Sequence, residues 1–288
     1  MALIAAALYL AFLESATARC LAIVGIFSVE SDSVQRGVHR RYLGLSNQVT
    51  FGGNCTGIKA ISVRFVVCSK QPSQTLVNEQ REYRDLLVLP TRENMNDGKT
   101  QIFFETIVRS SFEVNHVLKA DIDTFIHVGN LVKALTDVGA QSNYTRFSYY
   151  GRIIGNFPVP SHGWIMGCIY GMSYDLVVAY AKHSELRQDA LRGGEDKVST
   201  RIAAAVSKNL NQTCHWVSDT NIHDHPDCGC GSNAVAFSNQ TVAIHQLKAL
   251  SLWNSTLRYF FGENQILKNV IPSHFPGLRY RTCKVIID

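Results

Sequence analysis

Short apolar runs alternate with amphipathic segments through the first half of the chain, and this alternation constrains the fold more than any other feature. Residues 21–27 (LAIVGIF) and 61–67 (ISVRFVV) are short, rich in β-branched side chains and bounded by polar residues, which is typical of buried strands. Residues 86–89 form a third such run, which Pro90 ends. Helices are predicted between and after these runs, at residues 34–45, 76–86 and 99–108. Because strands that alternate with helices pair in parallel, the sequence predicts an α/β fold with a doubly wound, mostly parallel central sheet.

The composition fits one large folded domain. The 288 residues are 46% hydrophobic and 18% charged, which excludes a disordered chain, because disorder needs fewer apolar residues and more net charge. The net charge is only +5 and the basic residues are scattered, so we expect no dedicated nucleic-acid surface. No linker-like or repeated segment interrupts the pattern. We therefore expect a single domain over residues 19–288.

The N-terminus predicts a route into the secretory pathway. Residues 1–13 are apolar and uncharged, but they fall short of the ~20 residues that a membrane-spanning helix needs. Ala16 and Ala18 match the small-residue pattern that precedes a signal-peptidase site. Residues 1–18 are therefore predicted to be a signal peptide or a signal-anchor. A buried first helix is the alternative.

A membrane anchor would have to extend into the apolar run of residues 21–27. Glu14 and Arg19 would then lie in the membrane, at a cost of roughly 2.5–3.5 kcal/mol each near a helix centre. Such an anchor would also use up the first strand of the sheet, which favours a cleaved signal. Asn-x-Thr sequons are more frequent than the composition predicts by chance, and they support a protein of the ER or Golgi lumen. Their asparagines are Asn54, Asn143, Asn211, Asn239 and Asn254.

The motif that carries most chemical information is Asp121-Ile122-Asp123, which follows a predicted strand beginning near His116. Two carboxylates at positions i and i+2 project to the same side if the backbone is extended. At the carboxyl end of a strand in an open α/β sheet, they lie where ligands bind. Two hard oxygen ligands on one side suit Mn²⁺ or Mg²⁺, and such a cation neutralises a diphosphate. A solvated acidic turn is the alternative, because this short pattern is common.

Two further positions are candidates for chemistry. Gly193-Gly194 leads into Glu195 and Asp196, and one of these adjacent acids is a candidate general base for a substrate hydroxyl. If both acids are partly buried, the pKa of one of them rises. A helix N-terminus with favourable acids in its first turn explains the pair equally well. His245 follows a β-like run, where a lone histidine is more often structural than functional.

Two arginines after the first predicted strand, Arg36 and Arg40, are candidate ligands for phosphate oxygens. A solvated basic helix face is the alternative for both. The segment 209–232 is polar and carries His and Cys residues, so it is predicted to be a loop. In a secretory compartment a disulfide-pinned loop is favoured there over a zinc site, but the pairing cannot be read from the sequence.

Short segments occur in a fixed order along the chain, and together they resemble one family. They are residues 23–28 with Arg36 and Arg40, residues 64–67, Glu79 with residues 83–87, residues 94–100, residues 119–125, residues 167–176, residues 195–198, and His245 with Lys248. In this order they resemble the inverting β1,3-glycosyltransferases, which include β1,3-galactosyltransferases, β1,3-N-acetylglucosaminyltransferases and Fringe proteins. Residues 94–100 are similar to the form found in protozoan members. The similarity covers roughly residues 21–250 and depends on the ordered spacing of weak motifs.

The resemblance implies a Rossmann-like domain of GT-A type that uses Mn²⁺ (or Mg²⁺). It also implies a UDP-sugar donor, UDP-Gal or UDP-GlcNAc, and a glycan acceptor that receives the sugar in β1,3 linkage with inversion. By position, Asp123 is implied as the main metal ligand together with His245. Asp121 and the two arginines are implied as donor-side residues, and Asp196 is implied as the general base.

The chain departs from the family pattern at several places. The middle acid of the family's D-D-D motif is Ile122 here, and the usual R-x-T-W ending reads Arg-Tyr-Leu at residues 41–43. Lys197 separates Asp196 from the valine of the E-D-V block. These departures support an alternative hypothesis, in which the protein is a catalytically inactive relative that serves as a chaperone or a glycan-binding module.

Overall fold

The computed structural model describes residues 19–262, apart from residues 59, 111, 141–145, 157–158, 160, 184–193 and 230–232. The predicted signal peptide or anchor at residues 1–18 lies outside this part, as do Gly193 and residues 263–288. Within the described part, no helix combines the length and the apolar character that crossing a membrane requires.

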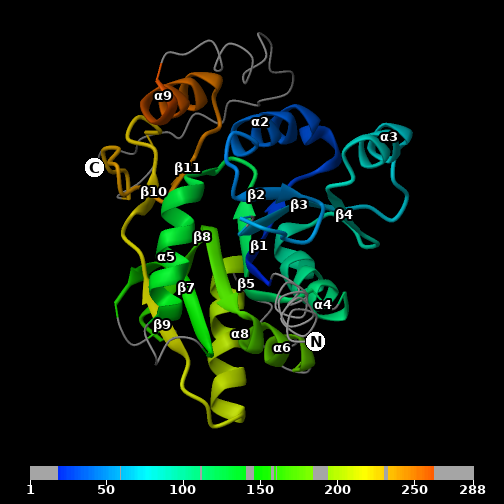
Figure 1. Cartoon of the computed structure of the whole chain (residues 1–288). Coiled ribbons are helices and arrows are strands. Elements are labelled where there is room, and N and C mark those ends of the chain that lie inside the picture. Colours follow the sequence, from blue (N-terminus) through cyan, green and yellow to red (C-terminus); the bar gives the residue numbers. More distant parts are fainter. Residues whose placement is uncertain are drawn as a thin grey trace, which may run out of the picture.

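An eight-stranded sheet forms the middle layer of the protein (Figure 1). Its strands are β1 (Cys20–Phe27), β2 (Val49–Phe51), β3 (Ile61–Cys68), β4 (Leu86–Leu89), β5 (Val114–Asp121), β7 (Ser148–Gly155), β8 (Gly163–Ser173) and β9 (His215–Ser218). The order is β2-β3-β1-β5-β8-β7-β9, and β4 pairs with β3. All pairs are parallel except those that β8 makes with β5 and β7. The predicted α/β class with a mostly parallel central sheet is confirmed.

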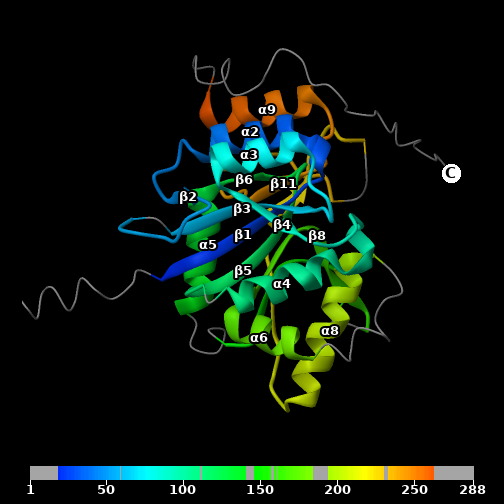
Figure 2. The same cartoon turned by 90° about the vertical axis from the view of Figure 1, so that its right-hand side faces the viewer.

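Helices cover both faces of the sheet, and Figure 2 shows the two helical layers. The helices are α2 (Ser33–Leu43), α3 (Gln74–Tyr83), α4 (Thr100–Arg109), α5 (Val128–Ala140), α6 (Tyr174–Lys182), α8 (Glu195–Asn209) and α9 (Leu250–Phe261), with single turns at Glu30–Asp32 and Met95–Lys99. Buried side chains of α2, α3, α5 and α9 pack on one face, and those of α4, α6 and α8 on the other. The three predicted strands and three predicted helices of the first half are all present, with ends shifted by a few residues.

Strand β1 shows why the sheet needs a core on each side. Val24 and Ile26 point into the core under α2, whereas Ile23 and Phe27 point into the core over α4. This alternation follows from the two-residue period of a strand. Gly25 lies against the ring of Phe103, and a Cβ at that position would come within 2.5 Å of it, so only glycine allows α4 to pack this closely.

The start of β1 is covalently tied to the next connection. Cys20 forms a disulfide with Cys55, which lies between β2 and β3. Cys214, which lies in the segment where a disulfide-pinned loop was predicted, is a free thiol. The prediction of a loop over residues 209–232 is also wrong in part, because β9 and a further strand, β10 (Ile222–Asp224), lie there.

A second, three-stranded sheet lies beside the central one. Its order is β10-β11-β6, with β6 at Phe125–Ile126 and β11 at Ala243–His245. Strand β11 pairs antiparallel with β6 and parallel with β10, so that His245 lies opposite Asp224. The small sheet therefore brings a late segment of the chain to the turn that follows β5.

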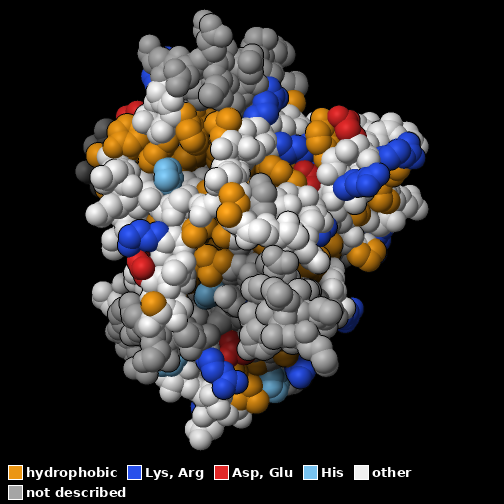
Figure 3. Space-filling model, in the orientation of Figure 1, with side chains coloured by type: hydrophobic (Ala, Val, Ile, Leu, Met, Phe, Trp, Pro, Cys, Tyr) orange, Lys and Arg blue, Asp and Glu red, His pale blue; other side chains and the backbone are white. Residues whose placement is uncertain are grey.

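Hydrophobic side chains gather on the surface around α9, as the space-filling view in Figure 3 shows. Tyr259 of this helix is about half exposed, at 51%, and its ring packs against Phe237 and Phe260. On its inner side α9 buries Trp253 and Leu257 against the core. The indole of Trp253 thereby reaches a cavity that Asp121 and Asp123 also line.

Candidate functional site

A cavity of about 590 Å³ opens at the carboxyl edge of the parallel strands. Ligands bind at this edge in open α/β sheets. The register places Phe27, the last residue of β1, opposite Asp121, the last residue of β5, and both line the cavity. Its other lining residues are Asp32, Gln35, Met95, Asn96, Lys119, Ile122, Asp123, Gly167, Gly194, Glu195, Asp196, His245, Leu247, Lys248 and Trp253.

Asp121 and Asp123 face this cavity from a turn. Strand β5 ends at Asp121, and the amide of Thr124 donates a hydrogen bond of 3.1 Å to the carbonyl of Asp121. The sequence argument for a shared direction holds only if the backbone is extended over these residues, and the structure has a turn there instead. The two carboxylates lie together because the chain turns between them. Ile122, between the two acids, packs against the core with its half-buried side chain.

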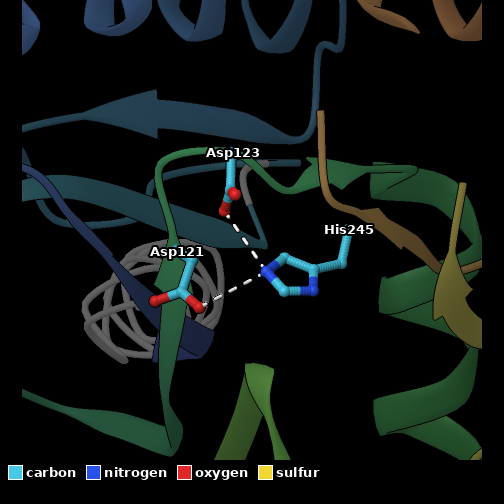
Figure 4. A group of neighbouring side chains, drawn as sticks. All are labelled: Asp121, Asp123 and His245. Carbon is cyan, nitrogen blue, oxygen red and sulfur yellow. Dashed lines mark ion pairs between the residues drawn. The ribbon is translucent and has the colours of Figure 1, made fainter. Parts of the chain in front are cut away.

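His245 completes a group of three side chains around one point. Its Nε2 lies 3.3 Å from an oxygen of Asp123 and 3.8 Å from an oxygen of Asp121, and Figure 4 shows both carboxylates directed at the imidazole. One ligand atom of each residue lies within 4.8 Å of those of the other two. Among the described residues, this is the only group of three or more His, Cys, Asp or Glu side chains close enough to share a metal ion.

The orientation of His245 is set by Asp224, a residue that the sequence analysis did not identify. Its carboxylate oxygen accepts a hydrogen bond of 3.0 Å from Nδ1 of His245, and its side chain is only 6% exposed. Nε2 is then the nitrogen that faces the two acids. A carboxylate behind a histidine in this way is the usual outer partner of a metal-binding imidazole. The signal was present in the pattern His-Asp-His at residues 223–225, but it was interpreted as part of a loop.

Electrostatics at this group favour a cation. Burial alone would lower the pKa of His245, but the charges of Asp123, Asp224 and Asp121 outweigh burial and raise it well above its ordinary value. Burial alone would raise the pKa of Asp123, but the nearby imidazole of His245 outweighs burial and lowers it. The carboxylates thus attract positive charge strongly, either a proton on the histidine or a metal ion that displaces it.

Lys119 links the two sides of the cavity. It is almost fully buried. Its Nζ lies 2.6 Å from Oδ1 of Asp121, and the two groups form an ion pair whose geometry is not that of a hydrogen bond. The same ammonium donates to the carbonyl of Gly167 at 2.6 Å and lies 3.4 Å from Glu195. Burial disfavours the charged lysine, but the two carboxylates outweigh burial and raise its pKa. The buried ammonium therefore stays charged and holds both acids in place.

Asp196 lines the same cavity as the three-residue group and lies in the first turn of α8. Burial raises its pKa above the ordinary value of 3.8, and the negative charge of Glu195 adds to this effect. A carboxylate with a raised pKa is a stronger base, which suits proton removal from a hydroxyl. Its side chain packs against Gly167, where a Cβ would come within 3.3 Å of Asp196.

Glu195 has a structural position beside this base. Its carboxylate accepts hydrogen bonds from Thr100, at 2.7 Å, and from the hydroxyl of Tyr170, in addition to the ion pair with Lys119. The amide of Glu195 donates to the side chain of Asn96. These contacts fix the N-terminus of α8 against β8 and α4, so the next residue, Asp196, projects into the cavity.

Arg36 and Arg40 are not brought to the cavity. Arg36 is fully buried, and Glu79 binds its guanidinium through two contacts of 2.6 and 2.8 Å. Arg40 binds Glu79 at 2.8 Å and Asp85 through two contacts of 2.8 Å, and it stacks on the ring of Tyr83. In this geometry the two arginines stabilise α2 against α3 and β4. Phosphate binding by them stays a prediction from sequence.

Comparison with protein families gives one match, to a family of glycosyltransferases. In particular, residues 50–187 match the family model described as galactosyltransferase, and the family resemblance predicted from the sequence is confirmed over this range. The matched range contains Asp121 and Asp123, whereas Asp196 and His245 follow it. A search of curated protein sequences finds no match to this chain.

Solved structures with a similar chain path also include glycosyltransferases. The galactosyltransferase LgtC, in complex with donor and acceptor sugar analogs, is 9% identical; the superposition covers 87% of this chain and 100% of that chain, with a TM-score of 0.46. The apo-form glycosyltransferase GlyE of Streptococcus pneumoniae is 9% identical, with 79% of this chain and 54% of that chain covered and a TM-score of 0.45.

Proposed function

We propose that the protein is an inverting, metal-dependent β1,3-glycosyltransferase that moves galactose or N-acetylglucosamine from a UDP-sugar to a glycan hydroxyl. The observation that carries the proposal is one cavity that is lined both by the group of Asp121, Asp123 and His245 and by Asp196. The group of three can hold a cation and a diphosphate, and Asp196 can accept a proton. The family match supports the reaction class.

The group of Asp121, Asp123 and His245 fits a divalent cation of the Mn²⁺ or Mg²⁺ type. Two carboxylates offer hard oxygen ligands, and one imidazole nitrogen suits Mn²⁺ in particular. Asp123 and His245 would hold the ion, with Asp121 beside them, and Asp224 would keep the imidazole in the ligating orientation. When bound, the ion would stabilise the negative charge that develops on the departing UDP.

The remaining steps belong to side chains of the chain itself. The carboxylate of Asp196 would take the proton of the acceptor hydroxyl as that oxygen attacks the anomeric carbon of the donor. The bond from that carbon to the diphosphate breaks in the same displacement, which inverts the configuration. Lys119 pairs with both Asp121 and Glu195 and so holds these two acids in place. Neither Lys119 nor Glu195 takes part in the bond changes.

We place this activity in the lumen of the ER or Golgi. The Cys20–Cys55 disulfide supports this location, because structural disulfides persist in oxidising compartments. The sequons and the apolar segment at residues 1–18 support it from the sequence. That segment would act as a signal peptide or as a membrane anchor, and residues 19–288 would form one catalytic domain.

A second candidate function follows from Ile122. Its apolar side chain lines the cavity where the family carries an acid, which removes one polar contact to a donor. A relative that binds a glycan or a nucleotide without turnover would fit this difference. The two functions separate in one assay, because only the enzyme releases UDP from a UDP-sugar.

The test combines binding with turnover. The purified protein is titrated calorimetrically with UDP with and without Mn²⁺, and it is then incubated with a panel of UDP-sugars. We expect Mn²⁺-dependent UDP binding and release of UDP from one hexose donor. The variant Asp123→Asn should lose Mn²⁺ affinity by more than about a hundredfold, because the loss of a ligand exceeds the tenfold to hundredfold cost of losing an outer partner.

The matched control is Asp137→Asn. Asp137 is well exposed on α5 and pairs with Lys133 one turn earlier, so its replacement should leave metal binding unchanged. Normal turnover by Asp123→Asn would refute the metal assignment. UDP binding without turnover of any donor would favour the inactive relative.

A further inference from the structure

The turn between the two acids is held through its backbone. Each of the three carbonyl groups from Asp121 to Asp123 has a donor: the amide of Thr124 at 3.1 Å for Asp121, Nε2 of His39 at 2.8 Å for Ile122, and the amide of Leu247 at 3.0 Å for Asp123. Two of these donors are backbone amides of nearby segments. The third is a side chain that arrives from α2, on the other side of the turn.

His39 is itself held in one orientation. It is fully buried, and its ring lies against the rings of Trp253 and Phe65, with centroid distances of 5.3 and 6.1 Å. Its Nδ1 lies 3.1 Å from the hydroxyl of Tyr42, which also accepts a hydrogen bond of 3.2 Å from the amide of Ile126. The network therefore reaches from α2 to both ends of the segment that carries the acidic pair.

The chemistry of this network determines where its protons lie. Burial lowers the pKa of His39 to about 4, so the ring is neutral at physiological pH and carries one N–H. The carbonyl of Ile122 only accepts, so that N–H is at Nε2 and Nδ1 accepts from the hydroxyl of Tyr42. A donor that is fixed on both sides defines the plane of the Ile122 peptide.

The acidic pair needs such support. Asp121 and Asp123 carry like charges into one cavity, and their repulsion favours any backbone rotation that separates them. The side chain of Ile122 packs against the core but offers no polar contact to oppose this rotation. Two of the departures from the family pattern meet here, since Tyr42 lies in the altered R-x-T-W segment and Ile122 replaces the middle acid.

We propose that His39, oriented by Tyr42, is a positioning residue that fixes the Ile122 peptide so that Asp121 and Asp123 present their carboxylates together to a divalent cation. This inference rests on the proposed metal-dependent function, and it assigns a role there to two residues of α2. His39 touches neither the ion nor the substrate. It acts only through the backbone between the two ligands.

The test measures Mn²⁺ affinity directly, by calorimetry on purified protein without any donor substrate. His39→Leu removes the donor but retains a buried apolar side chain, and we expect Mn²⁺ binding to weaken by about tenfold, the lower end of the effect of outer partners. His39→Gln places an amide N–H near the position of Nε2 and should restore affinity to within about twofold of the wild type. Tyr42→Phe, which removes only the hydroxyl, should lie between the two.

The control for loss of a buried histidine is His116→Leu. His116 is 4% exposed and lies on β5 away from the carboxyl edge, so its replacement should not change Mn²⁺ affinity. Hydrogen exchange measured by mass spectrometry provides a second readout, and the amides of residues 122–124 should exchange faster in His39→Leu than in His116→Leu.

The outcomes separate this inference from the proposed function. Absence of Mn²⁺ binding in the wild-type protein would refute both. Wild-type affinity in His39→Leu, or the same loss in His39→Gln as in His39→Leu, would overturn the positioning role alone. If His39→Leu does not fold, the comparison of His39→Gln and Tyr42→Phe with the wild type decides in the same way.

Discussion

Two clusters of charged side chains differ in what they face. In the arginine cluster, Arg36 and Arg40 face the carboxylates of Glu79 and Asp85 at 2.6 to 2.8 Å, so two positive charges meet two negative ones. In the acidic cluster, Asp121, Asp123 and Asp224 lie around His245, while Lys119 pairs with Asp121 and Lys248 lies 3.9 Å from Asp123. The first cluster pairs within the fold, whereas Asp121, Asp123 and His245 of the second line the cavity.

This difference shows why residue type alone is a poor guide to function. Both clusters follow ordered motifs, and both contain residues with the chemistry of a phosphate or metal site. The guanidinium of Arg36 already donates to Glu79, to Ser28 and to two backbone carbonyls, whereas Asp121 and Asp123 line a cavity that a ligand can enter. Three experiments test this distinction.

The largest effect is expected in the arginine cluster, from Glu79→Gln. This change leaves the guanidinium of Arg36, which is fully buried, without its charged partner. Breaking a buried pair in this way costs about 3 kcal/mol or more, and we expect the free energy of unfolding in urea, followed by intrinsic fluorescence, to fall by that amount. Mn²⁺ affinity should stay at the wild-type value. A loss of UDP affinity with little loss of stability would show instead that the cluster contacts the donor.

An intermediate effect is expected in the acidic cluster, from Asp224→Asn. The amide still accepts from Nδ1 of His245, but its negative charge is gone, so the imidazole is a weaker ligand. Titration with Mn²⁺ should give a dissociation constant about tenfold higher than that of the wild type. Stability in urea should change little, because the variant removes one of several like charges. An unchanged Mn²⁺ affinity would contradict the role of Asp224 behind the histidine.

The smallest effect on stability is expected from Asp196→Asn, in the first turn of α8. Because the pKa of Asp196 is raised, the folded protein holds this proton more tightly than the unfolded chain does. The carboxyl stabilises the fold below its ordinary pKa of 3.8, and this contribution is lost as the pH rises through the raised pKa. The variant should therefore melt about a degree or two higher than the wild type at pH 7. This difference should shrink as the pH is lowered.

The same variant should lose transfer activity by about a hundredfold or more, since the base is missing. In the wild type, kcat/KM should rise with pH through the raised pKa of Asp196, because only the ionised carboxylate accepts the proton. A pH profile of transfer from the UDP-sugar measures this limb. A variant that melts lower at pH 7 yet retains activity would show that Asp196 belongs to a balanced structural cluster like that of the arginines.

The parts of the fold that follow from local pattern could be predicted from the sequence. The alternation of β-branched runs with amphipathic segments is enough for β1, β3 and β4 and the helices between them, because each signal lies within one element. Strands β9 and β10 were missed because they are short and polar, and only their partners identify them as strands. A turn at the acidic pair was among the interpretations of the sequence, but the way in which this turn brings both carboxylates together was not.

The site divides in the same way. The acidic pair and Asp196 stand out by residue type and by family resemblance. Asp224 and His39 do not, because they act through hydrogen bonds to segments that are distant in the sequence. The sequence also gives no sign of the ion pairs that join Arg36 and Arg40 to Glu79, and a donor-side role of these arginines stays a prediction.

The small sheet β10-β11-β6 has a consequence for the order in which the site is made. Asp121 and Asp123 precede strands β7, β8 and β9, whereas Asp224 and His245 follow all of them. A chain emerging from the ribosome exposes its N-terminal elements first. It therefore carries an acidic pair without its histidine until every strand of the central sheet has been synthesised. At the proposed metal site, binding of a cation would thereby wait until a stage at which the central sheet can already have formed.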